Sequence, residues 1–207
     1  MLIYAFNAVL SNGRLDVWMR NQSGLTLIEL LVTLVVLSIV IGIAVPSFRE
    51  LVLNNRITSQ LNTVSGTLSF ARSSASSRPG ASVTFCSSTN GAACNGGANW
   101  ENGWIVFRDV DGDAAVDAGD DEILRVNSGL AGGNTLRIRG FGGVNSSVRF
   151  DPEGMPRMPA GAAAAGTFIV CDERGVERAS ALVVSGAGQI RIVRDGNDHN
   201  GNAIGCP

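Results

Sequence analysis

The sequence predicts an α+β protein in which a long N-terminal helix packs on an antiparallel, β-rich head. Two patterns indicate the helix: an apolar run over residues 25–45, and after it apolar residues at alternating spacings of three and four. Short apolar or alternating segments, separated by Gly, Asn and Asp, begin near Ser82 and indicate strands. The sequence therefore divides into a leader at 1–24, a membrane-spanning segment at 25–45, an amphipathic helix at 46–78 and a head at 79–207.

Residues 25–45 form an apolar run whose only charged residue is Glu29. At 1.5 Å per residue, a helix of this length spans about 30 Å, which is the thickness of the hydrocarbon core of a bilayer. A secretory signal peptide has a shorter apolar region that ends at a small-residue cleavage site, whereas this run continues into more helix. We therefore expect a transmembrane helix.

Glu29 is unusual because a carboxylate inside an apolar span costs a few kcal/mol and needs a partner. Cleavage after Gly24 would create an amino group at Leu25, four residues before Glu29, and a cation there would compensate the carboxylate. The alternative is that Glu29 is a polar residue tolerated near the membrane interface.

The segment from Gly24 to Leu30, which reads Gly-Leu-Thr-Leu-Ile-Glu-Leu, resembles the prepilin processing site of type IV pilins and type II secretion pseudopilins. The resemblance implies that a prepilin peptidase cuts between Gly24 and Leu25 and N-methylates Leu25. It also implies that Glu29 pairs with the N-terminus of a neighbouring subunit during assembly. Leu25 departs from the family pattern, which usually has Phe at this position. Because leaders of the family are short and basic, we expect translation to begin at Met19.

The apolar stripe after the membrane segment predicts an amphipathic helix that packs against the head. Pro46 should kink the helix or break it locally, helped by Gly42. The sequence Arg-Pro-Gly at 78–80 should end the helix near Ser77. The stripe comprises Leu53, Ile57, Leu61, Val64, Leu68, Ala71 and Ala75.

Eight short segments of the head have the composition of strands, with turn residues between them. No helical pattern separates one from the next, so we expect antiparallel pairing. Apolar residues alternate with Arg at 136–139, which indicates a strand with one solvent-facing side. The segments are Val83–Cys86, Trp104–Asp109, Ile123–Val126, Leu136–Gly140, Ser147–Phe150, Thr167–Cys171, Ala181–Val184 and Gln189–Val193, and the Ala-rich run at 159–166 is expected to be a loop.

Three segments of the head, at 100–107, 148–154 and 184–191, resemble the GspH/FimT family of type II secretion pseudopilins and type IV minor pilins. With the leader helix, the resemblance covers residues 24–207. It implies a pilin-like fold and a structural subunit of a type II secretion pseudopilus or a type IV pilus. The implied location is the inner membrane, with one span and a periplasmic head. The implied partners are other pilins or pseudopilins, the prepilin peptidase, the inner-membrane assembly platform and, before assembly, membrane lipid.

Four cysteines in a head outside the cytoplasm favour disulfide bonds, and four cysteines allow three pairings. We favour Cys86–Cys94 and Cys171–Cys206, because each bond then stays within a local hairpin or tail. The alternative is a zinc site. The cysteine spacing is not C-x-x-C, however, and the single histidine, His199, lies in a tail rich in Gly and Asn.

Residues 109–120 place carboxylates at positions 1, 3, 5, 9 and 12 of a twelve-residue window, which is close to an EF-hand calcium loop. Ala114 stands where that loop has Gly, and strands rather than helices are expected on both sides. We favour a solvated turn over a calcium site, and expect no metal. The calcium alternative would use Asp109, Asp111, Asp113, Asp117 and Asp120.

The C-terminal segment bears on an alternative function, DNA binding in natural transformation. In the FimT branch this activity is associated with a Gly-Arg-x-Arg pattern, of which Gly188 and Arg191 are present while Gln189 replaces the first Arg. Phosphate contacts need clustered cations, and here the cluster is weak. It consists of Arg191 and Arg194, opposed by Asp195 and Asp198.

The sequence offers no catalytic constellation. It has no G-x-S-x-G, no P-loop and no H-E-x-x-H, and its one histidine has no evident nucleophile beside it. A net charge of −2 gives no general attraction to polyanions. We therefore expect neither an enzyme nor a bound cofactor.

Overall fold

The computed structural model describes residues 24–77, 80–143, 146–157, 164–194 and 196–207. The expected leader, with its start at Met19, lies outside these residues, and so does most of the Ala-rich run. The chain divides into two compact units, one up to Ser47 and the other from Phe48 onward.

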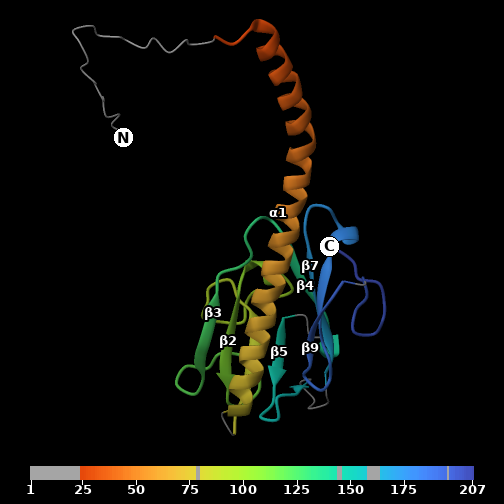
Figure 1. Ribbon diagram of the computed structural model, residues 1–207. Helices are drawn as coiled ribbons and strands as arrows, with labels where there is room; N and C mark the ends of the chain where they lie inside the picture. Colours follow the sequence, from red (N-terminus) through yellow and green to blue (C-terminus); the bar gives the residue numbers. More distant parts are fainter. Residues whose placement is uncertain (1–23, 78–79, 144–145, 158–163, 195) are drawn as a thin grey trace, which may run out of the picture. The chain divides into compact units, whose positions relative to one another are not determined.

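One long helix, α1 (Leu27–Ser77), passes through the unit boundary without interruption (Figure 1). Pro46 lies inside it, so the local break considered from the sequence is wrong. Proline removes one backbone hydrogen bond, to the carbonyl of Gly42. A break would instead leave several backbone groups unpaired beside an apolar segment, which is costlier in lipid. The helix ends at Ser77, as predicted.

In the first unit, the side chains of α1 are exposed. None of the residues in its most apolar stretch is buried within the chain, and by length and composition this stretch could cross a bilayer. It is the one such helix among the described residues. A helix that is apolar all round in this way needs a cover that its own chain does not supply.

In the second unit, α1 buries one face. All seven residues of the predicted stripe are buried, from Leu53 to Ala75, which confirms the amphipathic helix. The buried amide of Gln60 joins them without being left unpaired, because it donates to the carbonyl of Ala131 at 2.9 Å and accepts from the amide of Asn134 at 2.7 Å.

Within the described residues, nine strands form two antiparallel sheets. All eight predicted strands are present, with ends that differ by a residue or so, and the two-residue strand β6 is additional. The division into two sheets was not predicted. The five-stranded sheet consists of β3 (Glu122–Asn127), β2 (Trp104–Asp109), β1 (Ser82–Ser87), β5 (Ser147–Phe150) and β6 (Pro156–Arg157), and the four-stranded sheet of β4 (Thr135–Gly140), β7 (Gly166–Cys171), β8 (Ser180–Val184) and β9 (Ile190–Val193).

Three short 3₁₀ helices connect the strands: η1 (Trp100–Asn102), η2 (Phe141–Gly143) and η3 (Val176–Arg178). The main core lies where the inner faces of the two sheets meet the buried face of α1. Aromatic rings join the sheets there. The ring centroid of Phe85, from β1, lies 5.7 Å from that of Phe168, from β7, and Trp100 packs 4.7 Å from Phe85.

Each sheet also carries a smaller apolar cluster on its other face, and a disulfide bond belongs to each cluster. On the five-stranded sheet, Ile105 and Phe107 are covered by Val116 and by the bond between Cys86 and Cys94. On the four-stranded sheet, Ile204 and the bond between Cys171 and Cys206 cover a cluster of Ile169, Ala181, Val183 and Val193. The two bonds are the pairs that the sequence favoured, and each fastens a loop or tail onto the outside of a sheet.

Candidate functional site

The N-terminus of α1 is built by Thr26 and Glu29. The hydroxyl of Thr26 accepts a hydrogen bond from the backbone N–H of Glu29 at 3.2 Å, and its carbonyl accepts one from Leu30. Thr26 is thus the N-cap residue, with Glu29 at the third helical position, which is the spacing of a capping box. Sequence reasoning missed the role of Thr26, although the Thr-x-x-Glu spacing would have revealed it.

This cap fixes where the charge of Glu29 lies. Glu29 stands in the first turn of α1, where the positive end of the helix dipole favours a carboxylate, directly after the Gly24–Leu25 junction. In the described part of the chain no ion pair involves Glu29, and the neighbouring Leu25 and Leu27 are exposed. The first turn therefore presents a carboxylate that has no ion-pair partner within the described residues, beside an exposed apolar surface.

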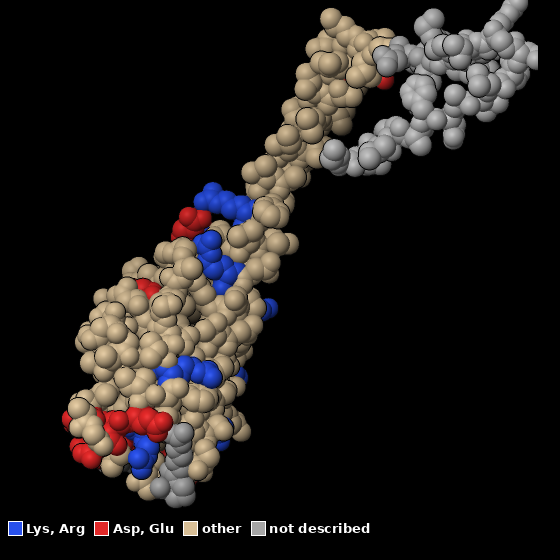
Figure 2. All heavy atoms as spheres, turned by 90° about the vertical axis from the view of Figure 1, so that its left-hand side faces the viewer, with Lys and Arg blue, Asp and Glu red and all other residues tan. Residues whose placement is uncertain are grey.

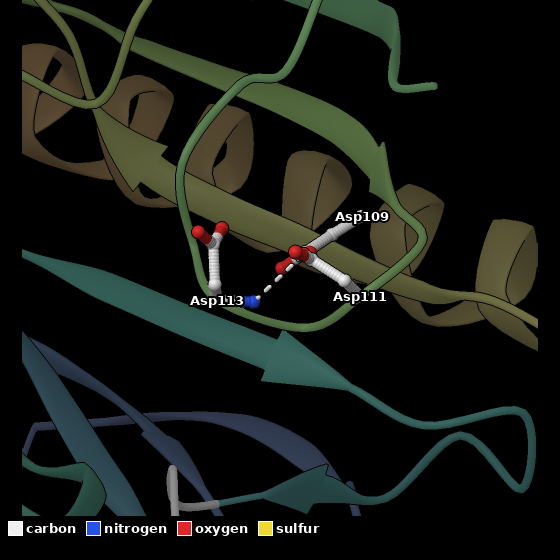
Figure 3. A group of neighbouring side chains, drawn as sticks. All are labelled: Asp109, Asp111 and Asp113. Carbon is white, nitrogen blue, oxygen red and sulfur yellow. Dashed lines mark hydrogen bonds between the residues drawn. The ribbon is translucent and has the colours of Figure 1, made fainter.

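The acidic loop, residues 109–121, brings together three of the five carboxylates of the calcium-like window. One oxygen from each of Asp109, Asp111 and Asp113 lies within 4.8 Å of the others (Figure 3). Asp117 and Asp120 are not part of this group. Figure 2 shows acidic side chains gathered at one end of the head.

Asp109 is the internal anchor of this loop. Its buried carboxylate accepts hydrogen bonds from the hydroxyl of Thr84 at 2.6 Å and from the backbone N–H groups of Gly112 and Ala114 at 2.7 and 3.2 Å. Burial raises the pKa of Asp109 above its ordinary value, and the three hydrogen bonds offset only part of that effect. The oxygens of Asp109 are thus already used in holding the turn.

Asp121 closes the other end of the acidic loop. Its carboxylate accepts hydrogen bonds from the backbone N–H groups of Val110 and Asp117, both at 3.0 Å. Sequence reasoning missed Asp121 because it lies one residue beyond the twelve-residue window. The negative charge of Asp113, together with the other loop carboxylates, raises the pKa of the exposed Asp117. The loop therefore holds its shape through hydrogen bonds of its own.

Arg191 and Arg194 face different surroundings. Arg191 is exposed and lies opposite Val183 in the β8–β9 pairing, while Arg194 lines a hollow of about 360 Å³ with Asn54 and Ile57 of α1. Asp198, one of the two acidic residues that oppose this cluster in sequence, is buried, and Asp195 lies outside the described residues.

Asp198 instead organises the C-terminal turn. Its carboxylate accepts hydrogen bonds from the backbone N–H groups of Asn200 and Asn202 at 2.8 and 3.0 Å. Burial acts to raise the pKa of Asp198, but these hydrogen bonds outweigh it and hold the pKa below its ordinary value.

A capped apolar helix, joined to a head of two antiparallel sheets with disulfide-fastened loops, is the architecture of a pilin-class subunit. The type IV minor pilin FimU of Pseudomonas aeruginosa PAO1 has a similar fold, with a TM-score of 0.50 at 18% identity over 71% of this chain and 95% of FimU. A second crystal form of FimU gives a TM-score of 0.48 at 17% identity, over 70% and 98% of the two chains. No curated protein matches the chain.

The sequence profile of the type II transport protein GspH matches residues 60–188, and that of the prokaryotic N-terminal methylation motif matches residues 19–45. The chain belongs to the GspH family, whose members are structural pilin subunits. It is thus a minor pilin or pseudopilin.

Proposed function

We propose that this protein is a structural subunit of a periplasmic fibre, either a type II secretion pseudopilus or a type IV pilus. A prepilin peptidase cleaves it between Gly24 and Leu25 and N-methylates Leu25. Residues 25–45 anchor it in the inner membrane and later form its assembly segment, residues 46–78 continue the helix, and the head at 79–207 is periplasmic. Its partners are other pilins or pseudopilins, the inner-membrane assembly platform and, before assembly, membrane lipid.

The observation that carries the proposal is the carboxylate of Glu29, which lies in the capped first turn of α1 and has no ion-pair partner in the part of the chain that the structure describes. Lipid tails are as apolar as leucine side chains, so moving the helix from lipid into a fibre gains little hydrophobic free energy. A carboxylate in that apolar setting remains costly until it meets a cation. The amino group of Leu25 on a neighbouring subunit supplies one, and the pairing selects the register of assembly.

The test replaces Glu29 by Gln, which keeps the length of the side chain and removes its charge. We expect the Glu29→Gln and Glu29→Ala variants to be cleaved normally and to be absent from sheared fibres or from cross-linked assemblies. Thr26→Ala is the matched control, because it removes the cap and keeps the charge, and it should be incorporated. Normal incorporation of Glu29→Gln would refute the role of charge pairing.

The processing step is tested separately at Gly24. A bulkier residue, as in Gly24→Val, should leave the uncleaved precursor in the membrane, as seen by mass on a denaturing gel.

A deletion strain scored in parallel for twitching, protein secretion and DNA uptake then identifies the machine to which the subunit belongs. Loss of secretion alone assigns the subunit to the type II system, and loss of twitching alone assigns it to a type IV pilus.

A further inference from the structure

The helix α1 has little apolar contact with the head just before its buried stripe begins. Phe48, Leu51 and Val52 are 68%, 55% and 38% exposed, and the first buried residue of the stripe is Leu53. Packing therefore holds α1 only from Leu53 onward. Among the described residues, polar contacts to Arg49, Glu50 and Asn54 of α1 come from the segment 172–178, which connects β7 to β8.

Arg174 is the centre of these contacts. Its guanidinium donates to the side-chain oxygen of Asn54 on α1 at 2.9 Å. Its Nε and Nη2 atoms donate to Oδ2 of Asp172 at 3.0 and 2.6 Å, and its backbone N–H donates to Oδ1 of the same carboxylate at 2.9 Å. A guanidinium group held by several hydrogen bonds keeps its orientation, because these bonds would have to break together.

The Arg174–Asp172 pair is shielded from water. The side chain of Asp172 is fully buried and that of Arg174 is 15% exposed. Burial opposes the charged carboxylate, but the hydrogen bonds and the charge of Arg174 outweigh it and lower the pKa of Asp172. Breaking a buried, hydrogen-bonded ion pair is costly, because it leaves an uncompensated buried charge. Arg174 therefore reaches α1 from a fixed position.

Two exposed ion pairs flank Arg174, and their polarities are opposite. Arg49 of α1 pairs with Glu173 at 2.7 Å, whereas Glu50 of α1 pairs with Arg178 at 3.7 Å. Each residue step along a helix turns it by about 100°. If this part of α1 advanced by one residue, Glu50 would move toward Glu173, and the reverse step would move Arg49 toward Arg178. Either rotation would therefore place side chains of like charge opposite each other.

We propose that Asp172, Glu173, Arg174 and Arg178 form a clamp that fixes residues 49–54 of α1 on the head, with Arg174 as its central positioning residue. The inference rests on the proposed function, since incorporation into a fibre is the step that the clamp would support. The clamp acts on α1 residues 49–54 alone, and is separate from Glu29 and from the processing site.

The test uses charge reversal at the exposed pair Arg49–Glu173, where substitution leaves the core intact. We expect Arg49→Glu and Glu173→Arg each to lower incorporation by about two- to fivefold, as an exposed ion pair allows, and the double variant to restore it. Glu177→Arg is the control, because it makes the same charge change in the same segment at a residue outside the clamp, and it should be incorporated normally.

A second measurement concerns Arg174. The Arg174→Ala variant should show faster amide hydrogen exchange in residues 48–54 of the full chain in detergent.

Two results would overturn the clamp: single reversals that are incorporated like the wild type, or a folded double variant that fails to recover. Should Arg174→Ala unfold the head, the surface reversals still decide the matter. Failure of the proposed function looks different. Glu29→Gln would then be incorporated normally, while the exchange measurement on α1 would still report whether the clamp holds the helix.

Discussion

Gly188 lies against Gly154 so closely that a Cβ atom on Gly188 would come within 2.3 Å of the carbonyl oxygen of Gly154. The two glycines belong to turns of different sheets, and Arg72 of α1 packs beside both. The three residues join the two sheets to the last turns of the helix. The glycine of the Gly-Arg-x-Arg pattern thus has a structural reason to be present that does not involve DNA.

This contact predicts that Gly188→Ala is strongly destabilising. Gly188 and Gly196 have the same φ of +73°, but a Cβ on Gly196 would meet nothing within 4 Å. Gly196→Ala should therefore cost only the left-handed backbone conformation, about 1 kcal/mol. Gly188→Ala should cost about 3 kcal/mol or more, because backbone must also move. Urea unfolding followed by tryptophan fluorescence measures both, and equal losses would contradict the contact.

Ala114 offers a stabilising substitution. It has a φ of +65°, in a region that L-residues adopt at a cost, at the position where an EF-hand loop has glycine. We expect Ala114→Gly to raise the free energy of unfolding by about 0.5–1 kcal/mol, since relief of strain exceeds the added entropy of the unfolded chain. A decrease in stability would show that the methyl group of Ala114 contributes packing that outweighs the strain.

Calcium should have little effect on stability, because only three carboxylates of the window converge. In addition, both carboxylate oxygens of Asp109 already accept hydrogen bonds from Thr84 and from its own loop. We expect the thermal midpoint of the protein in excess calcium to equal that in chelator. A rise of several degrees that chelator reverses, and that Asp111→Asn abolishes, would establish the calcium alternative.

The C-terminal turn should be sensitive to acid. The pKa of Asp198 lies below its ordinary value of 3.8, so its charge stabilises the fold above that pH, and this contribution is lost as the pH falls through the lower, folded-state pKa. Asp198→Ala removes two backbone hydrogen bonds and should cost about 1–2 kcal/mol at neutral pH. Asp198→Asn keeps an accepting oxygen and should cost less. Unfolding curves recorded at pH 7 and in acid should show the wild type converging on the Asn variant, because a protonated carboxyl keeps one accepting oxygen as the amide does.

The two disulfide bonds should contribute unequally. Cys86 and Cys94 are 8 residues apart, whereas Cys171 and Cys206 are 35 apart. Loop entropy then predicts about 2.5 kcal/mol for the first bond and about 4 kcal/mol for the second. Replacing each pair by Ala and comparing denaturant midpoints tests this order. A larger loss for the short loop would mean that its cluster with Ile105 and Phe107 matters more than chain entropy.

The sequence predicted the elements of this fold well because their signals are local. The stripe on α1 and the apolar alternation in the strands each depend on a few neighbouring residues. The division into two sheets depends on pairing between distant segments, and no local pattern records it. For example, β4 follows β3 in sequence but pairs with β7.

The candidate sites divide in the same way. Glu29 and its cap lie within one turn, so the sequence contains both. The roles of Asp121, Arg72 and Asp198 follow from how loops and turns fold back, and no local sequence pattern records that. Arg191 and Arg194 are close in sequence, yet a strand and its end direct them to different surroundings.

The two disulfide bonds follow one another along the chain without interleaving. In a head that crosses the membrane from its N-terminal end, Cys86 and Cys94 would both have emerged before Cys171 does. Oxidation in order of emergence then gives the native pairs. Maturation of this subunit should therefore need an oxidant for its thiols but no isomerase to reshuffle them.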